Sequence, residues 1–449
     1  MRSLLTMAFL ATLAMLRPDT LAGREIPDAK NTKFIRGAFC TSPSELALDP
    51  QPHGPGPLTL RAVYCHSGDI GTYNNRAPAV SPDARHRATF GDPRGVLRIM
   101  KMSEKEASVS YDTGVAFDEW TLGSDPVVAW SSDSKFLWTA RQERMRPTGG
   151  WALSPLQPVR ASVSGHVTDL PQLEHPAGSL DGLLWVGGNG RALAQFGTRG
   201  GYYRPERPNP TPTFAIVDAA AGRVLDALPL ANLEPLLKPK RHPGAQRLTR
   251  HVLATQLPDG RVRALLHFTE GWVSWNQGDP IQEGPKLPEA RAYTLSGDGR
   301  MVLLTKPQTP GDSEVIVIAS CGPPRHPPCR PRQRTEMTLA AMHDAVTGDV
   351  IWSFRWKFDP QDETPSSAIS PDNRFALVGL VPTDIAENET FSVLYSKRRS
   401  IAVVSLKSGA ILQTIPAPSG NYAMGFAEAG KTVWVQNVNS VTLYSVSGH

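Results

Sequence analysis

Short apolar runs separated by tight polar turns recur along this chain. The clearest example is residues 366–380, in which two apolar runs flank the turn Pro371-Asp372-Asn373 and the second run begins at Arg374. Apolar runs of this length, bounded by Pro, Asp, Asn or Gly, are typical of β-hairpins. The pattern therefore predicts a hairpin over these residues.

The same hairpin pattern occurs seven times, with the leading residues of successive turns 39 to 74 residues apart. In every copy an Arg or Lys stands two positions after the leading residue of the turn. Asp and Asn at such positions hydrogen-bond to the backbone just ahead of them and tolerate left-handed geometry. We therefore predict that six of the leading residues are structural turn residues and not catalytic ones: Asp83, Asp133, Asn189, Asp259, Asp298 and Asp372. The seventh is Ala429.

A second hairpin with a glycine turn follows the first in most intervals. It is clearest over residues 213–225, 339–352 and 401–412 and weaker over 109–114 and 272–278. Each unit therefore has four predicted strands. Seven such units are typical of a β-propeller, in which each sheet buries both faces against its neighbours. The predicted fold class is all-β, a seven-bladed β-propeller.

The last unit is one strand short, because only three residues follow its apolar run at 441–446. An unpaired edge would remain there, and propellers avoid such edges by closing the ring. We predict that strands between Leu58 and Tyr73 complete the last blade.

The first residues have the features of a signal peptide. Arg2 precedes an apolar run from Leu4 to Leu16, and Thr20-Leu21-Ala22 is a candidate cleavage site. The predicted organisation is a signal peptide over 1–22, an extended lead-in over 23–56 and the propeller over 57–449. No later apolar run is long enough to cross a membrane as a helix, so we expect an exported protein, periplasmic or extracellular.

The composition changes this picture little. With 38 Gly and 41 Pro, the chain suits short strands joined by many turns. The net charge of +5 is mild, and the densest basic clusters, at 238–241 and 325–334, lie in proline-rich stretches. No basic helix or basic strand with interleaved aromatic residues is present, so nucleic acid is not an expected partner.

Four cysteines agree with export to an oxidising compartment. Cys321 and Cys329 bracket a short proline-rich stretch, and Cys40 and Cys65 remain as the other pair, although four cysteines allow three pairings. A metal site is the alternative, because His66 and His326 stand close to two of the cysteines. The absence of a Cys-x-x-Cys spacing argues against that alternative.

Four stretches are interpreted as insertions between units that project from the faces of the propeller: residues 142–180, 197–212, 231–246 and 306–336. One helical turn is expected at 233–237, and a strand at 315–320.

Local catalytic motifs are missing from the sequence. There is no Gly-x-Ser-x-Gly, His-Glu-x-x-His, phosphate-binding Gly-Lys-Ser/Thr loop or dinucleotide fingerprint. Among scattered histidines, His343 beside Asp344 is the one candidate for catalysis, and a hydrogen bond to its own turn is the structural alternative. No catalytic residue, metal site or cofactor is predicted.

The Ser-Pro-Asp-x-Arg hairpins resemble those of secreted and periplasmic propellers related to TolB, to YVTN-type repeats and to WD repeats. Residues 342–352 are similar to one repeat of the pyrroloquinoline-quinone propellers, with Met342 in place of alanine. The first resemblance covers nearly all of the chain after the signal peptide and implies the fold. The function that we expect is binding of a protein or cell-envelope partner. The alternatives are an enzyme or enzyme subunit, similar to the heavy chain of amine dehydrogenases or to propeller lactonases, and a small-ligand sensor.

Overall fold

The structure is a computed structural model of the chain. It describes residues 58–67, 79–91, 96–102, 109–112, 128–141, 144–145, 152–153, 156–197, 213–233, 251–268, 271–307, 335–358, 367–380, 399–417, 422–437 and 440–447. All of them belong to one compact unit, residues 34–449. No helix within these ranges has the length and apolarity needed to cross a membrane.

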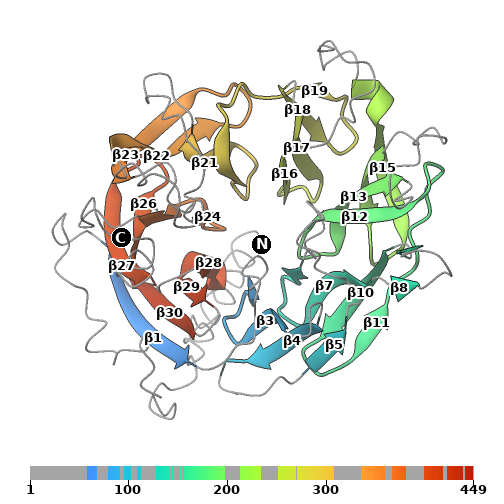
Figure 1. Cartoon of the computed structure of the whole chain (residues 1–449), viewed down its shortest axis with the longest axis horizontal. Coiled ribbons are helices and arrows are strands. Elements are labelled where there is room, and N and C mark those ends of the chain that lie inside the picture. Colours follow the sequence, from blue (N-terminus) through green and yellow to red (C-terminus); the bar gives the residue numbers. More distant parts are fainter. Residues whose placement is uncertain are drawn as a thin grey trace, which may run out of the picture. The chain divides into compact units, whose positions relative to one another are not determined.

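Seven four-stranded antiparallel sheets, the blades, follow one another around a ring (Figure 1). The strands of each blade are named from the inside of the ring outwards. Blade 1 contains β2 (Ala79–Val80), β3 (His86–Gly91), β4 (Val96–Lys101) and β5 (Val109–Asp112). Blade 2 contains β6 (Ala129–Trp130), β7 (Phe136–Arg141), β10 (Gln157–Ser162) and β11 (Val167–Asp169). Blade 3 contains β12 (Ser179–Val186), β13 (Arg191–Gly197), β14 (Thr213–Asp218) and β15 (Arg223–Pro229).

The remaining blades have the same order. Blade 4 contains β16 (His251–Gln256), β17 (Val262–Phe268), β18 (Gly271–Asn276) and β19 (Gln282–Glu283). Blade 5 contains β20 (Ala290–Leu295), β21 (Met301–Pro307), β22 (Thr335–Asp344) and β23 (Val350–Phe358). Blade 6 contains β24 (Ser367–Ile369), β25 (Phe375–Leu380), β26 (Arg399–Ser405) and β27 (Ile411–Ala417). Blade 7 contains β28 (Tyr422–Ala427), β29 (Thr432–Asn437), β30 (Ser440–Ser447) and β1 (Thr59–Ser67).

Within the described residues, three further short elements lie outside the blades. They are the hairpin of β8 (Arg144–Met145) with β9 (Ala152–Leu153) and the 3₁₀ turns η2 (Leu230–Leu233) and η3 (Glu428–Gly430). The turn η2 ends at Leu233, the first residue of the helical turn expected at 233–237, and residues 234–237 lie outside the described ranges. The seven-bladed all-β fold predicted from the hairpins is confirmed.

Blade 7 is closed by the two ends of the propeller. Strand β1 pairs antiparallel with β30, from Thr59 opposite Ser447 to Ser67 opposite Ser440. This pairing confirms that an N-terminal strand completes the last blade. The described part of that strand ends at Ser67, so the stretch from there to Tyr73 lies outside the described residues.

The hydrophobic core is divided among the junctions between neighbouring blades. Between blades 5 and 6, for example, Leu303, Met342 and Trp352 pack with Val378 and Val404. Because the two faces of a sheet are both covered, a second strand such as β25 is buried along its whole length. This explains why such strands are continuous apolar runs in the sequence.

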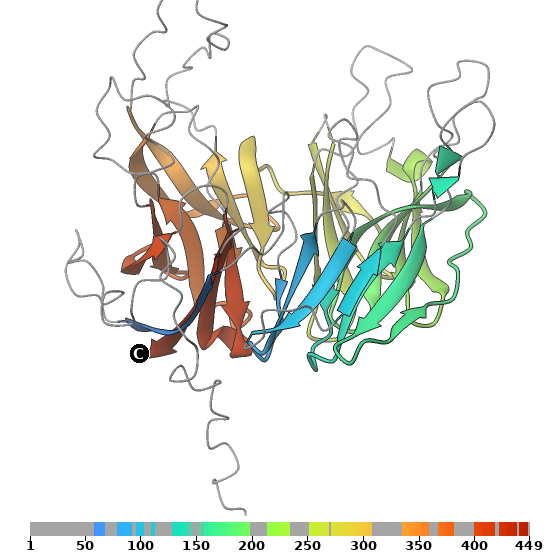
Figure 2. The same ribbon diagram turned by 60° about the horizontal axis from the view of Figure 1, so that its bottom comes forward.

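Successive strands of a blade run between two sides of the ring (Figure 2). The first strand leads into the turn that carries the Asp or Asn, so we call that side the turn side. The second strand ends on the opposite side, and the connection to the next blade arrives there too. The strand ends that flank residues 198–212, 234–250, 308–334 and 381–398 all lie on this second side, which we call the insertion side.

Two expectations about the insertions are wrong. Residues 157–169, within the stretch 142–180, form β10 and β11, the outer half of blade 2. Strand β11 is only three residues long and largely exposed, so it has no apolar alternation by which to recognise it. The stretches 197–212 and 306–336 begin and end inside blades 3 and 5, between second and third strands, and not between blades.

Several predictions fall on residues that the structure does not describe. They are the signal peptide at 1–22, the lead-in at 23–56, the strand at 315–320 and the residues Cys40, Cys321 and Cys329. Of Cys65 only the backbone is described, within β1. Disulfide bonds and export therefore stay predictions.

Candidate functional site

The repeated Asp and Asn residues are engaged by their own turns on the turn side. In blade 6 the Ser370 hydroxyl donates to Asp372 Oδ1 at 2.6 Å, and the Arg374 backbone N–H donates to the same oxygen at 3.2 Å. The same two contacts occur at Asp83, Asp133 and Asp298. Asn189 and Asp259 accept the backbone N–H of Arg191 and Arg261 at 3.1 and 2.9 Å. The Ser131 hydroxyl and the Lys135 N–H hold the pKa of Asp133 below its usual value.

The turns of neighbouring blades are also bonded to one another. The contacts at six junctions are Asp83 N to Ser134 Oγ (3.0 Å), Ser132 N to Gly188 O (3.2 Å), Arg191 Nη1 to Gly260 O, Thr255 Oγ1 to Gly297 O (2.9 Å), Gly297 N to Asn373 Oδ1 (3.2 Å) and Glu428 N to Pro82 O (2.6 Å). The polar groups of the turn side are thus used in holding the blades together.

His343 lies on the turn side as well. It is buried, and its Nδ1 donates to the carbonyl oxygen of Gly348 at 2.9 Å, in the turn that follows β22. The hydrogen bond that was the structural alternative for this residue is therefore present. Its Nε2 has no hydrogen-bond partner.

A cluster of four rings lies at the insertion side between blades 4 and 5. Strand pairing places His251 of β16 opposite His267 of β17, and His267 opposite Trp272 of β18. The two imidazoles are stacked at 5.6 Å between ring centres, and His267 stacks on the indole of Trp272 at 4.4 Å. We call these three residues together with Tyr293 the ring cluster.

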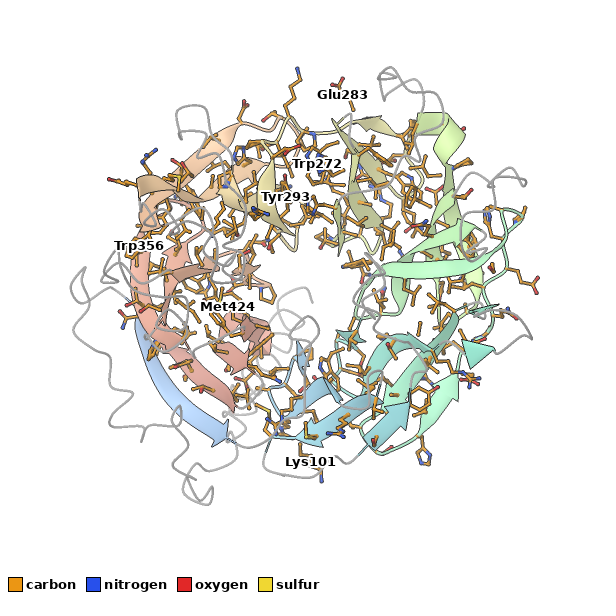
Figure 3. The ribbon with its side chains drawn as sticks, in the orientation of Figure 1. Lys101, Trp272, Glu283, Tyr293, Trp356 and Met424 are labelled. Carbon is orange, nitrogen blue, oxygen red and sulfur yellow. The ribbon has the colours of Figure 1, made fainter. Side chains whose placement is uncertain are left out.

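Tyr293 joins the ring cluster from blade 5. Its ring centre is 4.8 Å from that of His251 and 5.0 Å from that of Trp272 (Figure 3). The phenol oxygen accepts the N–H of Ala290 at 2.7 Å and donates to the carbonyl oxygen of Pro288 at 3.0 Å. Both of its hydrogen-bonding functions are used, so Tyr293 is fixed in place.

Lys306 lies on β21, the strand paired with that of Tyr293. The pairing of β20 with β21 places Tyr293 opposite Leu304 and Ala290 opposite Pro307, so Lys306 is level with the residues between them. It is 7 % exposed, and its φ is +48°. In the described residues, the other non-glycine positions with positive φ are in or beside the turn-side hairpins: Ala84, Ser134, Asn373, Glu428 and Ala429. A positive φ inside a strand is strained for lysine, and such strain is concentrated at functional sites.

The hydrogen bonding of the Trp272 indole is incomplete. Trp272 is 5 % exposed, and its Nε1–H has no acceptor. Among the described residues, the buried charged side chains are Arg87 and Lys306, and no Asp or Glu is buried.

Three stretches outside the described residues border β16, β17, β18 and β21 in the sequence. Residues 234–250 lead into His251, residues 269–270 join the strands of His267 and Trp272, and residues 308–334 follow directly after Pro307. Sequence reasoning missed this site, because no local motif links its members. One signal was available: His251 and His267 each stand eight residues from Asp259, the centre of their hairpin.

A metal centre is not indicated in the described parts of the chain. No group of three or more His, Cys, Asp or Glu residues there is arranged to hold a metal ion. The two stacked imidazoles of the ring cluster lie against the rings of Trp272 and Tyr293, which are not the side chains of a metal centre.

Comparison with known proteins gives little guidance. No family model matches the chain, and no curated protein sequence matches it. Among solved structures, the chain is similar to hydrazine synthase of Kuenenia stuttgartiensis, with a TM-score of 0.41 and 10 % sequence identity, over 84 % of this chain and 98 % of that one. This likeness is too low to bear on function.

Proposed function

We propose that the protein is an exported β-propeller that binds a protein or cell-envelope partner with its insertion side. The observation that supports this most is the difference between the two sides of the ring. The turn side carries short, nearly identical turns that bond to one another. The insertion side receives the ends of four connections of 15 to 27 residues, each different in sequence.

A rigid scaffold that presents variable connections on one side is a common arrangement for recognition. The blades supply the rigidity, because their junctions are packed with buried apolar residues. The resemblance of the hairpins to those of TolB-related and YVTN-type propellers supports an exported location.

The test is affinity capture from the exported fraction of the native source, with the full mature chain as bait. In separate variants, residues 198–212 and 381–398 are replaced by Gly-Ser linkers of equal length. We expect a partner at one-to-one stoichiometry, lost from at least one of these variants.

The controls change exposed charges on the turn side, with Arg85→Ala and Lys135→Ala. These variants should capture the partner as the wild type does. A partner that is lost from the turn-side variants and kept by both insertion-side variants would refute the proposal. A substrate turned over by the chain alone, with no partner captured, would favour the enzyme alternative.

A further inference from the structure

Apolar side chains are exposed on one hairpin of blade 5. Among the described residues, the large hydrophobic side chains that are well exposed are Val346, Val350 and Ile351, at 64, 59 and 45 %. Val346 lies in the turn between β22 and β23, and the other two are the first residues of β23, in the outer half of the blade (Figure 1). We call these three residues the rim patch. Single exposed apolar residues are normal, whereas a group of them is a sign of an interaction surface.

The equivalent hairpins of blades 3 and 6 have the same backbone but bury these positions. In all three blades the fourth strand carries a bulge three residues after the glycine of the turn. The residues at the bulge are Leu225, Ile351 and Leu412. Leu225 and Leu412 pack against apolar clusters. So do Val224 and Ile411, the counterparts of Val350. In blade 5 these positions are apolar as well, but they are uncovered.

The residues that cover the position in the other two blades come from the preceding blade. Ile411 of blade 6 packs in one cluster with residues of β23, the outer strand of blade 5. Those residues are Trp352, Phe354 and Trp356. Val224 of blade 3 packs in one cluster with Leu170 and Leu173, which follow β11, the outer strand of blade 2. An apolar segment at the outer edge of the neighbouring blade is therefore what normally covers this position.

The outer strand of blade 4 does not do this for blade 5. Strand β19 has only two residues, Gln282 and Glu283, and both are exposed. The junction between the two blades is packed as far as Ala345, which is buried in one cluster with Trp272. The rim patch begins at the next residue, Val346. It therefore continues a packed interface outward, beyond the residues of the propeller that cover it.

Two exposed basic residues border the hairpin turn that carries Val346. The backbone of Lys286 lies against Gly348, where a Cβ atom would come within 2.6 Å of the Lys286 nitrogen. The carbonyl oxygen of Arg300 accepts the backbone N–H of Ala345 at 2.8 Å. Both basic side chains are exposed. Positive charge thus stands beside the apolar residues on this flank.

A third exposed basic residue, Lys407, comes from blade 6. It follows Leu406, whose carbonyl oxygen accepts the indole N–H of Trp352, the next residue after the rim patch in β23. The exposed carboxylates of the same region are Asp349 in the hairpin turn and Glu283 on β19. Basic side chains are therefore in excess around the rim patch, which favours a partner with acidic residues.

We propose that the rim patch is a docking site for a segment of a partner protein that carries aliphatic or aromatic side chains between acidic residues. Its apolar side chains cover Val350 and Ile351 as the aromatic residues of β23 cover Ile411 in blade 6. Its acidic residues face the three basic side chains that border the patch. A second copy of the chain is disfavoured, because a symmetric contact would bring the same basic residues together. The proposal does not depend on partner binding by the insertion side.

Photo-crosslinking of the full chain in its native source tests the site. Val346→p-benzoylphenylalanine places a photoreactive side chain on the rim patch. On irradiation we expect a crosslink to one protein, and mass spectrometry of the crosslinked peptide should identify an apolar segment between acidic residues. The matched control is Ala220→p-benzoylphenylalanine, at the same turn position of blade 3, which is also exposed. The control should give no more product than a sample that has not been irradiated.

The segment identified in this way is then made as a synthetic peptide, and its Kd for the full chain is measured by calorimetry. Ile351→Ser removes apolar contact, and we expect it to weaken binding by about tenfold. Lys407→Glu reverses one bordering charge, for an expected weakening of about fivefold. Lys431→Glu makes the same change in net charge at an exposed lysine of blade 7 and should leave Kd unchanged. The substituted side chains are exposed or half-exposed, so the three variants should unfold at the wild-type Tm.

Four results would overturn the proposal. The first is no crosslinked product at Val346 above that of the Ala220 control. The second is a crosslink to a second copy of this chain or to lipid, since either would be a different occupant. The third is a crosslinked segment without acidic residues. The fourth is a Kd that is the same for Ile351→Ser as for the wild type.

Discussion

The indole Nε1 of Trp352 donates a hydrogen bond to the carbonyl oxygen of Leu406 at 2.8 Å, across the junction between blades 5 and 6. Both residues are buried. The side chain of Trp352 also lies against Gly409, where a Cβ atom would meet its Cδ2, Cγ and Cβ atoms at 2.8 to 3.1 Å. The tryptophan of the stretch 342–352 therefore fixes one blade to the turn of the next.

The substitution Trp352→Phe tests this contact. It removes the donor and leaves the buried Leu406 carbonyl without a partner, so we expect the free energy of unfolding to fall by about 1–3 kcal/mol. Urea unfolding followed by circular dichroism measures the change. Trp185→Phe, at a half-buried indole, is the control and should cost less. Equal losses in the two variants would show that the hydrogen bond contributes nothing beyond ring packing.

Asp226 holds blades 3 and 4 together. Its Oδ2 accepts the Nε1–H of Trp275 at 3.2 Å and the backbone N–H of Gly278 at 2.7 Å. Asp226→Ala leaves both donors without this carboxylate, and we expect a loss of about 3 kcal/mol in denaturant unfolding. The control Asp169→Ala removes an exposed ion pair with Arg141 and should cost less than about 1 kcal/mol. A loss in Asp226→Ala as small as in the control would contradict the inter-blade role.

Ring closure is tested by truncation. Deleting residues 57–75 removes β1 and exposes the edge of β30, which is paired with β1 over its whole length. We expect the truncated protein to lose its cooperative unfolding transition. Differential scanning calorimetry of both forms measures this. A truncated chain that unfolds like the intact one would show that closure by β1 is dispensable.

Acid should weaken the outer turn of blade 5. The N–H groups of Thr347 and Val346 donate to Asp344 Oδ1 at 2.8 and 2.7 Å, and they hold the pKa of this carboxyl below its usual value. A lowered pKa in the folded state stabilises the protein above the pKa of the unfolded chain, near 4, and this contribution is lost as the pH falls through the folded value.

Asp344→Asn should therefore be less stable than the wild type at pH 7, and the difference should shrink as the pH falls from about 5 to about 3. Urea midpoints at several pH values measure it. A difference that does not change with pH would rule out the carboxylate as its source.

The fold was predictable because its signals are local. The first hairpin of a blade is recognisable from a turn such as Ser370-Pro371-Asp372. There the Ser370 hydroxyl donates to Asp372 and accepts the N–H of Phe375, so all of the hydrogen bonds lie within six consecutive residues. The closing strand was predictable from the number of strands in each blade, because the last blade had three predicted strands and the others had four. The outer half of blade 2 was not, because Val167-Thr168-Asp169 is short and largely exposed and has no pattern of its own.

The candidate site was not predictable for a different reason. Its members come from five strands of two blades, and none is unusual in its own sequence context. His251 meets His267 only through the register of β16 with β17, and Tyr293 joins them only because blade 5 packs on blade 4. The positive φ of Lys306 is a property of the backbone, and it could not be predicted from the neighbouring residues Thr305 and Pro307.

The pairing of β1 with β30 also sets the order in which the protein can fold. Thr59 and Ser447 are neighbours in blade 7 although nearly the whole propeller separates them along the chain. During synthesis the first strand therefore waits without its partner until the last strand has been made. Six blades can assemble on the growing chain from contacts between sequence neighbours, whereas the seventh requires closure of a loop of hundreds of residues and is expected to form last.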